Sequence, residues 1–146
     1  MRLMRFELEI PGIPIAKHRP RFSTRGKFPV AYNDQRREER EWRIMAKSAL
    51  GRSGIRDFPV RKGVPVRLQV AFYMPVPKSF SNRKRNQLLG APHVKKPDAD
   101  NLVKFVKDCL NGLAWHDDSQ VWIVEARKVY GPEPKTEISL EWEDSA

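Results

Sequence analysis

Alternating apolar and polar side chains mark the clearest strands of the chain. In residues 5–10, RFELEI, and in residues 64–74, VPVRLQVAFYM, every second side chain is apolar, so one face of each segment can lie on a core. A proline follows each segment, Pro11 and Pro75, and ends the pattern. We therefore expect a strand at each of these places.

The C-terminal part of the chain repeats this alternation. Residues 119–130, SQVWIVEARKVY, and residues 136–142, TEISLEW, are rich in β-branched and aromatic side chains. The segment GPEPK, residues 131–135, joins them and has the glycine and prolines that suit a hairpin turn. The pattern predicts two strands that are joined as a hairpin.

Helical periodicity is strongest in residues 100–111. Their apolar side chains recur at the third, fourth, seventh and eighth positions after the first, Leu102, which is the spacing of one helix face. Asp100 is expected as the N-cap, and Gly112 lies where a helix commonly stops. This segment therefore predicts an amphipathic helix.

Two further helices complete the expected fold. An N-cap at Asn33 or Asp34 and a stop at Gly51 bound one helix, and a short basic helix is expected from Ser81. Strands and helices in this order predict a single α+β domain, residues 1–146. We expect a mixed sheet of about four strands with helices packed on one face.

The distribution of charge along the chain indicates a function. The formal net charge is +10, and two runs carry much of it: residues 17–27 hold five Lys or Arg without an acid, and residues 78–96 hold six. We expect loops or short helices in both runs. Solubilising charge is the alternative explanation for either run alone, whereas two such runs beside a cluster of acids favour DNA binding. The candidate DNA-binding residues are Lys17, Arg19, Arg21, Arg25, Lys27, Arg83, Lys84, Arg85, Lys95 and Lys96.

Several classes of protein are excluded by composition. The N-terminal segment lacks the apolar run of a signal peptide and no segment has the length of a membrane span, so a cytoplasmic protein without a membrane partner is expected. One cysteine and three scattered histidines allow neither an internal disulfide nor a zinc cluster. Cys109 suits the core, and Trp42, Trp122 and Trp142 suit core or dimer positions.

Aspartates gather in two short segments of this basic chain. Asp100 begins the helix at residues 100–111 and Asp98 lies two residues before it, while Asp117 and Asp118 follow the helix. A cap and a turn would explain one acid each, but not all four. If the chain returns along the helix, the carboxylates converge, and a cation is then needed to offset their repulsion. Oxygen ligands alone favour Mg²⁺, with Mn²⁺ as the alternative, and such a metal beside bound DNA predicts phosphodiester hydrolysis.

Residues 96–121, KPDADNLVKFVKDCLNGLAWHDDSQV, resemble the RusA family of Holliday junction resolvases. The likeness rests on D-x-D-N at the start of a helix, a lysine one turn later, and D-D-x-Q-V after the helix. Residues 13–34 are also similar to the basic N-terminal segment of phage-borne members. The resemblance implies a RusA-like fold and a metal-dependent endodeoxyribonuclease. It also implies a homodimer that nicks four-way junctions symmetrically in DNA recombination and repair.

The resemblance also assigns roles to individual residues. Asp98, Asp100 and Asp118 match the metal-binding carboxylates of the family and are the expected catalytic acids. Lys104 matches the family's catalytic lysine, and Asp117 is a further candidate metal ligand. Two alternatives stay open: a noncatalytic basic DNA-binding module, and a nuclease with a broader choice of branched or flap DNA.

Overall fold

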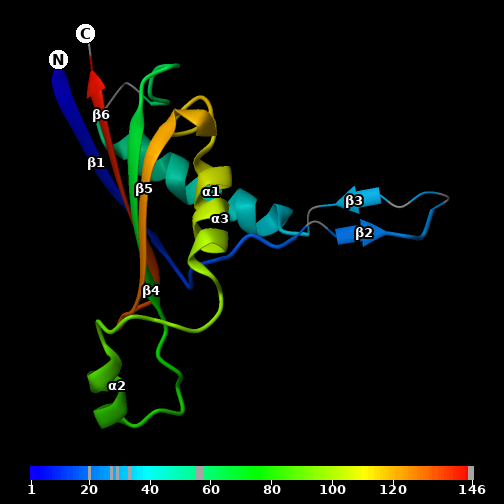
Figure 1. The fold of residues 1–146 in the computed structure, drawn as a ribbon, viewed down its shortest axis with the longest axis vertical. Helices are drawn as coiled ribbons and strands as arrows, with labels where there is room; N and C mark the ends of the chain where they lie inside the picture. Colours follow the sequence, from blue (N-terminus) through cyan, green and yellow to red (C-terminus); the bar gives the residue numbers. More distant parts are fainter. Residues whose placement is uncertain (20, 27, 29, 33, 55–57, 145–146) are drawn as a thin grey trace.

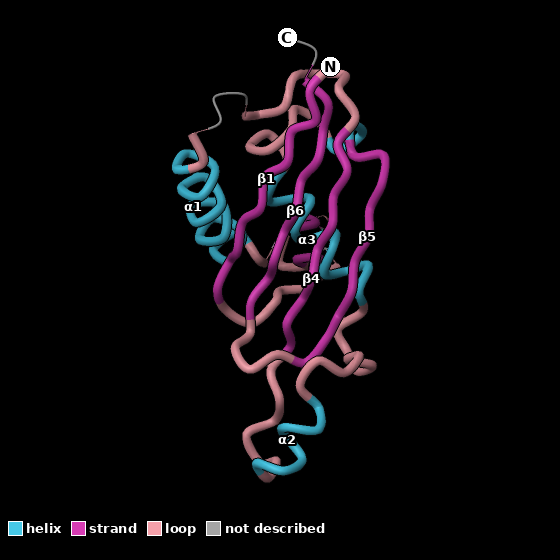
Figure 2. The backbone as a smooth tube through the Cα atoms, turned by 90° about the vertical axis from the view of Figure 1, so that its left-hand side faces the viewer, coloured by secondary structure: helices cyan, strands magenta, loops and turns pink. Residues whose placement is uncertain are grey.

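A four-stranded sheet forms the centre of the protein. The computed structural model describes residues 1–19, 21–26, 28, 30–32, 34–54 and 58–144. The strands are β1 (Arg2–Pro11), β4 (Val66–Met74), β5 (Val121–Tyr130) and β6 (Lys135–Asp144), in the spatial order β1-β6-β4-β5. β6 pairs antiparallel with β1 and β4, whereas β5 runs parallel to β4 (Figure 2). The predicted mixed sheet of about four strands is confirmed.

The predicted hairpin between β5 and β6 is wrong, because β4 lies between these two strands. The segment after β5 crosses the end of β4 instead, where the backbone N–H of Gly131 donates to the carbonyl of Met74 at 3.0 Å. A Cβ at Gly131 would lie 2.9 Å from side-chain atoms of Tyr73, so the crossing requires glycine there. Glycine and proline in residues 131–135 indicate a turn but do not determine which strand pairs with which. The apolar strand β4 is more stable in the interior of the sheet, where a strand on each side buries it.

Helices α1 (Arg36–Arg52) and α3 (Ala99–Leu110) cover one face of the sheet, as predicted (Figures 1 and 2). The core lies between them and the strands. Trp42 and Phe105 meet there edge to face, with ring centroids 6.1 Å apart. Cys109 is 1% exposed, and its burial raises the pKa of the thiol to about 12. Trp42 and Trp142 also belong to this core, whereas Trp122 is 68% exposed.

The helix boundaries differ from the predicted ones at both N-caps. The N-cap of α1 is Gln35 rather than Asp34 or Asn33, of which Asn33 lies outside the described residues, and the helix includes Gly51. The N-cap of α3 is Asp98 rather than Asp100, since the N–H of Leu102 already donates to the Asp98 carbonyl at 3.2 Å. Sequence preferences for caps do not separate two acids that lie two residues apart.

Two basic arms project from this body. In the first, β2 (Arg21–Ser23) and β3 (Val30–Tyr32) form a two-stranded hairpin, where a loop or short helix was expected. The second arm carries α2 (Asn82–Leu88), which begins after the predicted Ser81 and buries none of its residues. The hairpin arm leaves the body near the start of α1, and the α2 arm extends beyond one end of the sheet (Figure 1).

No helix in the described part of the chain is both long enough and apolar enough to cross a membrane.

Candidate active site

Asp98 and Asp100 lie exposed at the start of α3. Asp98 has an extended backbone and makes no side-chain capping bond, although it holds the N-cap position. Asp100 lies in the first helical turn, where the helix dipole favours a negative charge. Lys104 follows one turn later, on the same side of α3 as Asp100, and is exposed. The capping function therefore does not occupy the Asp98 carboxylate, which remains available to a ligand.

The second pair of acids lies in the turn before β5. The Asp117 carboxylate accepts hydrogen bonds from the hydroxyl and the backbone N–H of Ser119, and these bonds hold the pKa of Asp117 below its usual value. Oδ1 of Asp118 accepts a bond of 2.8 Å from the indole N–H of Trp115, a core residue. Asp117 thus shapes the turn, while Asp118 is half-buried and oriented by the core.

Gln120 holds this turn in place from beneath and is only 7% exposed. Its Oε1 accepts bonds from the backbone N–H groups of His116 and Asp117, at 2.8 and 3.1 Å. Its Nε2 donates to the carbonyls of Arg61 and Val64, at 2.9 and 3.1 Å. The amide therefore ties the acidic turn to a distant loop. The D-D-x-Q-V pattern contained this residue, but its role could not be read from the sequence.

The structure does not bring the two acidic pairs together within one chain. Asp98 precedes α3 and Asp118 follows it, and twelve helical residues span about 18 Å. The expected return of the chain does not occur, because the N–H of Gly112 bonds the carbonyl of Trp115 and closes a tight turn at the end of the helix. Within the described residues, no group of three or more His, Cys, Asp or Glu side chains could hold a metal ion. Figure 1 shows the two segments at opposite ends of α3.

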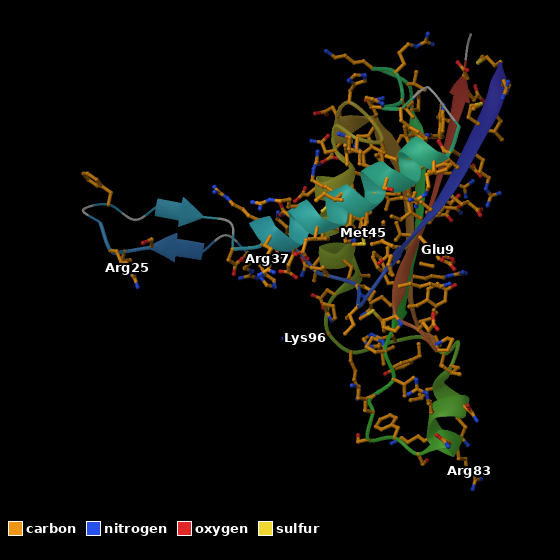
Figure 3. The ribbon with its side chains drawn as sticks, turned by 180° about the vertical axis from the view of Figure 1, so that it is seen from behind. Glu9, Arg25, Arg37, Met45, Arg83 and Lys96 are labelled. Atoms are coloured by element: carbon orange, nitrogen blue, oxygen red, sulfur yellow. The ribbon has the colours of Figure 1, made fainter. Side chains whose placement is uncertain are left out.

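The predicted DNA-binding residues lie mainly on the two arms and on the segment between α2 and α3. Arg25 and Arg83 extend from the two arms, and Lys96 lies on the segment between α2 and α3 (Figure 3). The exposed candidates are Arg19, Arg25, Arg83, Lys84, Lys95 and Lys96, with Arg85 half-buried; Arg21 lies in β2, and Lys27 lies outside the described residues. The ammonium of Lys84 also lies 4.0 Å from the ring centroid of Phe80.

Lys17 is engaged within the protein. Its ammonium lies 2.6 Å from Glu39 and 3.0 Å from Asp108, on α1 and α3. Burial lowers the Lys17 pKa, but the hydrogen bonds to both carboxylates outweigh burial and leave the pKa above its usual value. Two acids thus largely offset the charge of Lys17, and the ion pairs join the two core helices α1 and α3.

Comparisons with known proteins bear on the same residues. The family model described as Endodeoxyribonuclease RusA matches residues 11–141. An uncharacterized protein of Bacillus subtilis, YqaN, is 37% identical over 134 residues, which cover 88% of this chain and 90% of that protein. The crossover junction endodeoxyribonuclease RusA of Lactococcus phage r1t is 31% identical over 80 residues, 54% of this chain and 56% of the phage protein. The matched residues include both basic arms and both acidic pairs, and the chain belongs to the RusA family of endodeoxyribonucleases.

Proposed function

We propose that the protein is a Mg²⁺-dependent resolvase that cuts four-way DNA junctions by paired, symmetric nicks in recombination and repair. The name of the phage relative, a crossover junction endodeoxyribonuclease, supports the choice of substrate. The net charge of +10 and the two basic arms supply attraction for the phosphate backbone.

The donor set of the two acidic segments fits a hard divalent cation. Asp98, Asp100 and Asp118 offer carboxylate oxygens, and these are the ligands that Mg²⁺ and Mn²⁺ prefer. When bound, Mg²⁺ supplies Lewis-acid activation of the scissile phosphate and of a water molecule. The chain's own part is to hold these carboxylates and to place Lys104 where its ammonium can meet a phosphate oxygen. Asp117 acts mainly on the shape of the turn, through its bonds to Ser119.

One chain leaves the acidic pairs apart, so we place the complete site between two copies. A two-fold axis that is perpendicular to α3 and lies beside its middle places the start of α3 in one copy next to the end of α3 in the other. Asp98 and Asp100 of one copy then approach Asp118 of the other, and two equivalent sites result. This arrangement rests on the separation of the pairs along the 12 residues of α3.

The outer edge of β5 supports such a pair of chains. β5 is an edge strand of the sheet, next to α3, and it exposes Trp122 by 68% and Val124 by 42%. The end of this edge is covered by the backbone of residues 91–93, whereas the part that holds Trp122 and Val124 can pair with a second strand, and native proteins cover or charge such edges. A second copy of the chain covers this one without any further component.

The single observation that carries the proposal is the presence of two acidic segments at opposite ends of α3, of which the second is oriented by the indole of Trp115. The test uses labelled junction, flap, duplex and single-stranded DNA, with and without Mg²⁺. We expect the protein to cut the junction and not the other DNA substrates, and to do so only when Mg²⁺ is present. Equal cutting of flaps would assign the protein to a broader class of branched-DNA nucleases, and cutting without any divalent ion would contradict the metal site.

Variants test the shared site directly. We expect Asp98→Asn and Asp118→Asn each to bind junctions but to lose more than about 100-fold in cutting rate, more than an outer-shell change causes. After the two variants are mixed and subunits exchange, half of the dimers are mixed, and each of these regains one complete site. About a quarter of the sites should then be active, and each regained site makes a single nick. A mixture as inactive as its components would contradict a site shared between copies.

A further inference from the structure

The segment that leads into Asp98 is held by one side chain from a distant strand. Residues 94–98 lie between the α2 arm and α3 and belong to no helix or strand. The ammonium of Lys128, on β5, donates hydrogen bonds of 2.7 Å to the carbonyl of Lys95 and 2.7 Å to that of Pro97. Pro97 is bonded directly to Asp98. The cation therefore binds the backbone immediately before the first acidic residue.

The position of Lys128 follows from the register of the sheet. Lys128 pairs with Phe72 of β4, and both side chains lie on the face that α1 and α3 cover. Its neighbour Arg127 pairs with Ala71 and lies on the opposite, open face. Of these two neighbours, Lys128 is therefore the one on the side of the backbone that precedes α3.

Backbone bonds at the end of β5 fix the residues that come just before this segment. The N–H of His93 donates to the Lys128 carbonyl at 3.0 Å, and the N–H of Tyr130 donates to the Ala91 carbonyl at 3.0 Å. The residue that anchors His93 through its backbone thus anchors Lys95 and Pro97 through its side chain. Hydrogen bonds from an ionised donor are roughly twice as strong as neutral ones, which suits a cation to this role.

We propose that Lys128 is a positioning residue that sets the placement of Asp98 and Asp100, on the basis of the nuclease function proposed above. Lys128 acts through the backbone of residues 95–97 and not by contact with DNA. The base of the α2 arm is held by the same end of β5, so the basic arm and the two acids share one anchor.

The test replaces Lys128 with methionine, which keeps an unbranched side chain as far as Cε and removes the ammonium. Arg127→Met is the matched control, since it removes one cation from the adjacent position on the other face. We expect Lys128→Met to lower kcat at saturating junction by about 10- to 100-fold and to require more Mg²⁺ for half-maximal rate. Junction affinity in EDTA and the melting temperature should match those of the control.

Amide hydrogen exchange gives a readout that is independent of cutting. We expect faster exchange in residues 94–102 of Lys128→Met and wild-type exchange in Arg127→Met. Unchanged exchange and kcat in Lys128→Met would overturn the proposal. A loss of junction affinity in EDTA as large as the loss of kcat would also overturn it, because Lys128 would then be a DNA contact. If the wild-type protein cut no branched DNA, the proposed function would fall, while the exchange data would still decide whether Lys128 holds the segment.

Chemical rescue separates removal of the ammonium from general damage. In Lys128→Cys, reaction with 2-bromoethylamine restores an ammonium at nearly the original distance, as the introduced thiolate displaces bromide. Cys109 is the one natural cysteine, and its burial and raised pKa of about 12 protect it from the reagent. Recovery of kcat and of exchange protection after alkylation is expected, and failure of both to recover would count against the proposal.

Discussion

At the scale of single residues, buried polar side chains hold in place the segments that carry the candidate functional residues. Gln35 is 1% exposed, and its amide accepts from the N–H of His18 and donates to the carbonyl of Ala16, each at 2.8 Å. It therefore fixes the base of the hairpin arm, as Gln120 fixes the acidic turn. Both amides use donor and acceptor, which offsets the cost of burying them.

Lys17 provides a test at this scale, because its engagement by Glu39 and Asp108 argues for a role in stability. We expect Lys17→Met to lower the free energy of unfolding at pH 7 by about 1–2 kcal/mol, between the values for exposed and buried pairs. The folded-state pKa lies above the usual 10.5, so the stabilisation is complete below that pH. It disappears as the pH rises through the folded-state pKa. Urea unfolding at several pH values measures the difference.

Lys47→Met is the control for this prediction, because Lys47 is an exposed lysine of α1. It should change stability by less than about 0.5 kcal/mol. A stable Lys17→Met variant with weakened, less salt-dependent junction binding would instead make Lys17 a DNA contact.

At the scale of elements, α2 is a helix held away from the core. It buries no residue, and its N-cap Ser81 accepts a hydrogen bond from the N–H of Lys84. Such a helix contributes little to the stability of the domain, since most helical stability in proteins comes from packing. Its basic side chains are therefore free to serve binding.

The double variant Arg83→Ala and Lys84→Ala tests the α2 arm. We expect weaker junction binding and an unchanged unfolding midpoint. The slope of log K against log salt should fall by about 0.9 for each phosphate that the variant no longer neutralises, and binding titrations at several salt concentrations measure it. Arg2→Ala with Lys47→Ala removes the same charge outside both basic runs. A slope equal to that of this control would exclude phosphate binding by Arg83 and Lys84.

At the scale of the whole molecule, the charges and the apolar surface have different places. The excess of positive charge lies largely on the two arms, whereas Trp122 and Val124 expose apolar surface on the outer edge of β5. This separation suits the proposed assembly, in which the arms would bind a four-way junction and the edge would bind a second copy across a two-fold axis.

Trp122→Asp tests the assembly. We expect the variant to sediment as a folded monomer, because a charge on an edge strand opposes strand pairing. Because the proposed site needs two copies, the monomer should not cut junctions. Leu3→Asp is the matched control, since Leu3 is 67% exposed on the other edge strand, β1. A Trp122→Asp protein that remained dimeric would place the interface elsewhere.

Much of the fold could be predicted from local patterns. The periodicity of α3 identified its buried face correctly, from Leu102 to Leu110, because a regular helix fixes which side chains share a face. The alternation in β4 was equally informative. The partner of β5 could not be predicted, since turn composition in residues 131–135 is the same for a hairpin and for a crossing over the end of β4.

The candidate site divides in the same way. The available chemical groups follow from the sequence alone: carboxylates in two acidic segments and cations in two basic runs, because these properties belong to residue types. The positions of these groups depend on the folded chain, since the turn at Gly112 and the parallel course of β5 keep Asp98 and Asp118 at opposite ends of α3. The supports from Gln120 and Lys128 also depend on contacts between residues far apart in the chain, which no local pattern encodes.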